Sequence, residues 1–149
     1  MSHIKKSLLG ALLLLLLAFS LWFYKFSNEK NLIIAVAKGN NVDAQTYLHK
    51  WSDVNAIAYD GWTALTIASR NGDLSMVKWL LKNSANIDQP EGGGNTALFW
   101  ASFYGHVEVA KFLIQKDADV ERKCRGCKSP KEIAESNGHQ FIVKIIEAR

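Results

Sequence analysis

The feature that most constrains this 149-residue chain is a repeat with a period of 33 residues. Gly72, Gly105 and Gly138 follow one another at this spacing, and one further step back from Gly72 reaches Gly39. Other positions keep the same spacing: Ala35, Ala68, Ala101 and Ala134; Thr63, Thr96 and Ser129; Leu65 and Leu98. A fixed period of this length is typical of a stack of identical supersecondary units that bury their apolar faces against one another.

The residues around these positions resemble the ankyrin repeat family. Residues 60–69 read DGWTALTIAS and residues 94–106 read GNTALFWASFYGH, close to the family pattern G-x-T-P-L-H-x-A-A-x-x-G-H. The resemblance extends over roughly residues 29–149. It implies an all-α ankyrin-repeat solenoid, in which helix-turn-helix pairs carry hairpin fingers, over residues 31–149. The expected repeats are about 31–57, 58–90, 91–123 and 124–149.

Several repeated residues have a local role that the pattern predicts. Thr63 and Thr96 should cap the first helix of their repeats, because a threonine hydroxyl accepts a hydrogen bond from a free backbone N–H. Gly72, Gly105 and Gly138 should end that helix in a left-handed conformation. The first and fourth copies depart furthest from the pattern, so we expect them to act as end caps.

The N-terminal segment is the second large feature of the sequence. Residues 1–7 form a basic N-terminus, residues 8–24 an apolar run and residues 25–30 a short linker. The run is long enough for one N-terminal transmembrane helix, and it ends in the aromatic residues that favour a membrane interface. Alternatively, it is the apolar region of a signal peptide cleaved after Ser20.

The flanking charges favour one orientation of this segment. Lys5 and Lys6 should hold the N-terminus in the cytoplasm, so that the repeats lie on the exported side of the membrane. A short chain with one export segment favours a bacterial envelope protein. We therefore expect a single-pass membrane protein with periplasmic repeats or, after cleavage, a periplasmic protein.

Charge and composition exclude several classes of function. Outside residues 1–26 the chain has 15 Lys and Arg against 14 Asp and Glu, a net charge of +1. Nucleic-acid binding usually requires a basic face on the domain itself, so we expect no nucleic-acid partner. No spacing of residues indicates a nucleophile with its base, a metal site, a cofactor or a small-molecule substrate. The sequence therefore predicts a protein that is not an enzyme.

The two cysteines lie close together in one finger. Cys124 and Cys127 form a C-x-x-C motif between the third and fourth copies. The motif is compatible with a local disulfide, which an oxidising compartment favours, with inert thiols, or with redox or metal chemistry. The alternative to a binding function is therefore a thiol-redox or disulfide-dependent envelope factor.

The resemblance also implies where a protein partner docks. Ankyrin proteins bind mainly through finger tips and the concave side of the first helices, and the aromatic residues there should carry much of the binding energy. The matching positions are Tyr59, Asp60, Trp62, Arg70, Asn71, Asn95, Trp100, Phe103, Tyr104, Arg125 and Lys128. We expect a non-catalytic protein–protein interaction module, an adaptor or an inhibitor, that holds or masks its partner.

Overall fold

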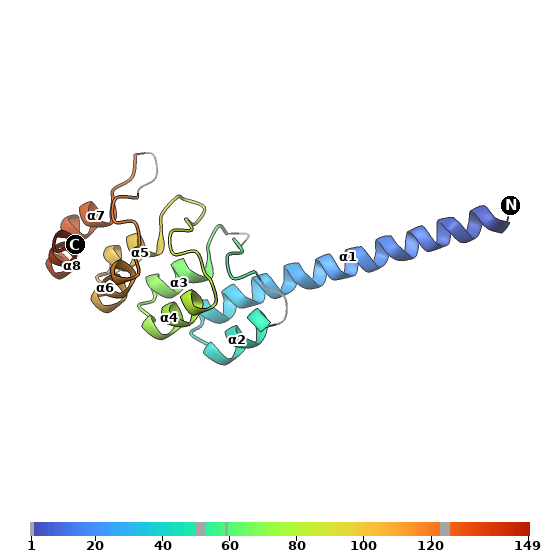
Figure 1. Ribbon diagram of the computed structural model, residues 1–149, viewed down its shortest axis with the longest axis horizontal. Helices are drawn as coiled ribbons and strands as arrows, with labels where there is room; N and C mark the ends of the chain where they lie inside the picture. Colours follow the sequence, from blue (N-terminus) through green and yellow to red (C-terminus); the bar gives the residue numbers. More distant parts are fainter. Residues whose placement is uncertain (1, 50–52, 59, 123–125) are drawn as a thin grey trace.

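The computed structural model describes residues 2–49, 53–58, 60–122 and 126–149 (Figure 1). Its helices are α1 (Ser2–Ala37), α2 (Asn41–His49), α3 (Ala64–Arg70), α4 (Leu74–Lys82), α5 (Ala97–Tyr104), α6 (Val107–Gln115), α7 (Pro130–Ser136) and α8 (Gln140–Glu147). The described residues contain no strand. The predicted all-α solenoid is therefore confirmed.

The helices form pairs that stack side by side. Within the pairs, α1 packs against α2, α3 against α4, α5 against α6 and α7 against α8. Between pairs, α3 contacts both α1 and α5, and α5 contacts α7. Figure 1 shows the loops that precede α3, α5 and α7 projecting from one side of this stack, while α1 extends beyond it as a single long rod.

The first helices of the repeats begin at the predicted caps. The Thr63 hydroxyl accepts a hydrogen bond from the Thr66 backbone N–H at 3.2 Å, and Thr96 accepts one from Phe99 at 3.4 Å. Ser129 makes the same contact with Glu132 at 3.2 Å. These bonds satisfy backbone donors that the helix itself leaves free, so the helices start in register with the repeat.

Glycines and histidines together join neighbouring repeats. Gly72 and Gly105 have the expected left-handed conformation, with φ of 72° and 74°. A Cβ at Gly72 would lie 2.6 Å from His106, and one at Gly105 would lie 2.6 Å from His139. Each glycine therefore leaves room for the histidine ring of the following repeat.

The histidine rings bind the backbone of the preceding repeat. His106 Nε2 lies 2.9 Å from the Arg70 carbonyl oxygen, and His139 Nε2 lies 3.1 Å from that of Phe103. Because a carbonyl oxygen only accepts, Nε2 of each ring is the donor in this hydrogen bond. The same glycine–histidine contact thus occurs at both junctions among the last three copies.

The first repeat differs from the expected arrangement at its start. Residues 25–30, expected as a short linker, are helical, because α1 runs without a break from the apolar run into the repeat core. No glycine or proline interrupts this part of the chain, and Lys25 and Glu29 form an i,i+4 ion pair at 3.8 Å. Leu32 and Val36, further along α1, are fully buried among the repeats. The C-terminal part of α1 is therefore the first helix of the stack.

Between Leu12 and Phe26, α1 exposes its large apolar side chains. The segment Leu12 to Ala37 is long and apolar enough to cross a membrane, judged by length and composition alone. In its most apolar stretch, 6% of the residues are buried in the protein. From Asn28 onward α1 is packed against the repeats, so a membrane can surround only the part before it. The apolar run at 8–24 spans about 25 Å at 1.5 Å per residue, close to the roughly 30 Å hydrocarbon thickness of a bilayer.

The last helix pair ends the stack with charged contacts. Lys131 Nζ on α7 lies 2.9 Å from Glu147 on α8, and this hydrogen bond and charge raise the pKa of Lys131 above its usual 10.5. Arg149 Nη1 donates to the Ala118 carbonyl oxygen at 2.8 Å, which joins the C-terminus to the third copy. The ion pair persists at neutral pH, and on the alkaline side it is lost when the pH rises through the elevated pKa of the lysine.

Replacing Gly105 with alanine should cost more stability than the same change at Gly138. Both glycines have a positive φ, 74° and 77°, which costs a non-glycine residue about 1–2 kcal/mol. Only at Gly105 does the new Cβ meet a neighbour, His139, whereas nothing lies within 4 Å at Gly138. Urea unfolding of the full chain in detergent, followed by circular dichroism, measures both losses. Equal losses would show that the glycine–histidine contact contributes nothing to stacking.

Candidate interaction surface

Four aromatic side chains cluster across the second and third repeats. Trp100, Phe103 and Tyr104 share one face of α5, since residues at i, i+3 and i+4 of a helix are neighbours. Trp62 reaches them from the loop before α3, with its ring centroid 4.9 Å from that of Trp100. The Trp100 ring lies 5.7 Å from Phe103 and 6.1 Å from Tyr104. The rings therefore form one continuous cluster rather than separate contacts.

Arg70, at the end of α3, lies between two of these rings. Its Cζ atom lies 5.2 Å from the Trp62 centroid and 5.8 Å from the Tyr104 centroid, within the range of a cation–π contact. Its Nε donates a hydrogen bond to the Tyr104 hydroxyl at 3.4 Å. Within the described residues no carboxylate pairs with Arg70, and its side chain is exposed. We name Trp62, Arg70, Trp100, Phe103 and Tyr104 the aromatic–arginine surface.

This surface is open to solvent in part. Tyr104 is 43% exposed and Arg70 is exposed, while Trp62, Trp100 and Phe103 are half-buried. Phe99, the residue before Trp100 on α5, is buried and contacts Trp100 edge-on at 5.4 Å between centroids. Rings held in this way lose little conformational freedom when a partner covers them, which favours binding.

Two other predicted binding residues have structural contacts instead. The Asn71 amide donates to the Ala37 carbonyl oxygen at 3.4 Å, which joins the second repeat to the end of α1. The Asn95 amide donates to Glu91 Oε1 at 2.8 Å and so closes the finger before α5. The sequence analysis expected both side chains to contact a partner, whereas in the structure their amides bind other parts of the protein.

The remaining predicted residues lie apart from the cluster or outside the described residues. Asp60 is exposed in the loop before α3 and accepts a hydrogen bond from Trp62 N at 3.4 Å. Lys128 Nζ donates to Ser136 Oγ at 2.6 Å in the fourth copy. Tyr59 and Arg125 lie outside the residues that the structure describes.

Tyr104 occupies a position where the neighbouring repeats have asparagine. Asn71 and Asn137, 33 residues before and after it, each donate to a carbonyl oxygen of the preceding repeat. Tyr104 instead meets the Arg70 side chain. The tyrosine at a repeat position that otherwise has asparagine is the feature of the sequence that indicates the Arg70–Tyr104 contact. The sequence analysis missed this contact because it considered the two residues separately.

Of the two cysteines, the structure describes only Cys127. Cys127 is disulfide-bonded, while Cys124 lies outside the described residues, so the pairing of these two cysteines stays a prediction. Across the part of the chain that the structure describes, no group of three or more His, Cys, Asp or Glu residues could hold a metal ion.

Comparison with known proteins agrees with this architecture. A family model described as ankyrin repeats (3 copies) matches residues 32–124. The match begins in the buried C-terminal part of α1 and includes α2 to α6. The helix pair α7 and α8 continues the same stack beyond it. No curated protein matches the chain.

Changing Tyr104 to asparagine should leave the stability of the protein nearly unchanged. In the third copy, the new asparagine would stand at the repeat position that Asn137 has in the fourth. Asn137 Nδ2 donates to the Phe103 carbonyl oxygen at 2.8 Å, and an equivalent hydrogen bond from the new amide would offset the lost ring contacts. By contrast, Asn137→Ala should lower the free energy of unfolding by about 1 kcal/mol. Thermal unfolding of both variants compares them. A larger loss for Tyr104→Asn would show that Tyr104 mainly supports the fold.

Proposed function

Because this chain belongs to the ankyrin-repeat family, a family of protein–protein interaction modules, we propose that it is a membrane-tethered, non-catalytic binding protein. It holds or masks one protein partner through the aromatic–arginine surface. The observation that carries this proposal is the packing of Arg70 between Trp62 and Tyr104 on a partly exposed face.

The residue types of this surface are those that dominate binding energy at protein interfaces. Tryptophan, tyrosine and arginine are enriched among interface residues whose truncation costs 2 kcal/mol or more. The rings supply apolar area to bury, and the Arg70 guanidinium supplies donors that suit a carboxylate. A partner that fits this surface therefore presents an apolar side chain next to an acidic group.

The exposed part of α1 supports a membrane anchor that is not cleaved. Cleavage after Ser20 would leave Trp22, Phe23 and Phe26, each about half exposed or more, on a water-soluble protein. In a bilayer the same side chains are covered by lipid and interfacial groups. Lys5 and Lys6 favour a cytoplasmic N-terminus, which places the repeats on the exported, periplasmic side of a bacterial membrane.

A continuous helix gives this tether a specific consequence. Because α1 is both the anchor and the first helix of the stack, no flexible segment separates the repeats from the membrane. The binding surface is thus held at a nearly constant height above the lipid. This arrangement suits a partner that is itself an envelope protein, either an enzyme that the repeats stabilise or a toxin that they inhibit.

Alanine at both Phe103 and Tyr104 should abolish partner binding. The change removes two rings of the surface but retains the Phe103 carbonyl oxygen that accepts from Asn137 and His139. Phe141→Ala on α8, which removes a ring that is 73% exposed elsewhere, is the matched control. Crosslinking in intact cells, followed by capture from the membrane fraction, should recover the partner with the parent and the control but not with the double variant.

Two outcomes of that capture would contradict the proposal. If the parent recovers no protein above background, the repeats have no stable protein partner. If the folded double variant recovers the same protein as the parent, the partner binds to another surface. Circular dichroism of each variant establishes that the repeats are folded.

Arginine at both Leu14 and Leu16 should remove the protein from the membrane. Each arginine near the centre of a spanning helix costs roughly 2.5–3.5 kcal/mol of insertion free energy. Extraction of membranes with alkaline carbonate should release this variant and retain both the parent and Leu14→Ala/Leu16→Ala. The retained parent should have the full-length mass of 16.7 kDa, whereas a shorter chain beginning after Ser20 would show a cleaved signal peptide.

A further inference from the structure

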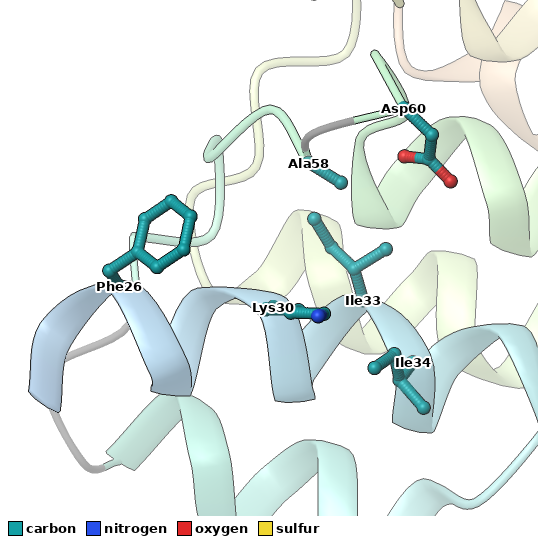
Figure 2. Close-up of a pocket in the computed structure, with 6 residues that line it drawn as sticks. All are labelled: Phe26, Lys30, Ile33, Ile34, Ala58 and Asp60. Atoms are coloured by element: carbon teal, nitrogen blue, oxygen red, sulfur yellow. The ribbon is translucent and has the colours of Figure 1, made fainter. Parts of the chain in front are cut away.

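A pocket lies where α1 leaves the repeats, away from the aromatic–arginine surface. Figure 2 shows the residues that line it: Phe26, Lys30, Ile33 and Ile34 of α1, with Ala58 and Asp60 of the loop before α3. Its volume is about 410 Å³, within the range of known small-molecule sites.

The lining combines apolar walls with two opposite charges. In Figure 2, Ile33 and Ala58 lie between Lys30 on α1 and Asp60 on the loop. Both charged residues are exposed, and neither forms an ion pair within the described part of the chain. Phe26 is 48% exposed at the end nearer the apolar run. The pocket therefore suits a ligand that carries both charges next to an apolar body.

The position of the pocket along α1 matches the polar layer of a membrane. If the hydrocarbon region ends at Tyr24, then Phe26 lies about 3 Å and Lys30 about 9 Å beyond it, at 1.5 Å per residue. The headgroup layer on each side of a bilayer is roughly 5–8 Å thick. Lys30 therefore lies at the level where lipid phosphate groups are found or just beyond it.

Aromatic rings connect the pocket with the membrane-spanning part of α1. The Phe19 and Trp22 rings are 6.0 Å apart, and the Trp22 and Phe26 rings stack at 5.6 Å. These residues lie at i, i+3 and i+7 and so follow one face of the helix toward Lys30. This face offers an acyl chain an apolar path that leads from the bilayer into the pocket.

We propose that this pocket binds the headgroup of a membrane phospholipid of the phosphatidylethanolamine type. Lys30 pairs with the phosphate, Asp60 pairs with the headgroup amine, and Phe26 and Ile33 contact the glycerol and the upper acyl chain. The inference rests on the membrane anchor of the proposed function. The bound lipid would fix the rotation of α1, and hence the direction in which the aromatic–arginine surface faces.

Photolabelling of the full chain in liposomes tests this site. The liposomes contain phosphatidylethanolamine and phosphatidylglycerol, with a trace of phosphatidylethanolamine that carries a diazirine near its glycerol. Mass spectrometry should locate adducts within residues 26–34. Lys30→Gln and Asp60→Asn should each lower this labelling at least fivefold, whereas the control Lys82→Gln on α4 should not change it.

Each other result would overturn the inference. Labelling confined to residues 8–24, or labelling of 26–34 that neither pocket variant lowers, would show that lipid acts only as solvent around α1. Equal labelling of residues 26–34 by phosphatidylglycerol that carries the same diazirine would show that the site does not select the headgroup amine. Alkaline carbonate extraction of the same liposomes shows whether the chain is anchored in the membrane. A chain that carbonate releases would contradict the proposed membrane anchor, whereas a retained chain with any of the results above would contradict the lipid site alone.

Discussion

The fold depends on a contact that the third and fourth repeats each make with the repeat before them. The missing side chain of Gly72 or Gly105 admits the histidine of the next repeat, and that histidine then binds a backbone carbonyl oxygen of the preceding repeat. A repeat of this size cannot bury its apolar face alone, so its stability comes from such junctions. The same dependence explains why α1 extends into the stack: its C-terminal part supplies the first surface on which the other repeats pack.

The proposed binding surface lies where the chain departs from this structural pattern. At one position of the repeat, Asn71 and Asn137 bind a neighbouring backbone, while Tyr104 is free to contact Arg70 and Trp100. The protein thus gives up one junction contact and gains part of an exposed aromatic cluster. Such an exchange of stability for function is common at binding sites.

The features that sequence reasoning predicted well are local or periodic. The all-α solenoid, the caps at Thr63 and Thr96 and the left-handed glycines each follow from a residue and its neighbours in sequence. The continuous α1 was missed, although the absence of glycine and proline from residues 25–30 and the i,i+4 pair of Lys25 and Glu29 favour a helix there. The Arg70–Tyr104 pair and the structural role of Asn71 were missed because both contacts join residues 34 positions apart. Which of the predicted binding residues touch a partner stays a prediction.

The central claim is that the aromatic–arginine surface, held above the membrane by α1, binds one protein partner. The most direct test places the photo-crosslinking amino acid p-benzoylphenylalanine at position 104 or at position 141 of the full chain, followed by irradiation of intact cells. The account predicts one discrete adduct with an envelope protein from position 104 and none from position 141. The same adducts from both positions, or none from position 104, would contradict it.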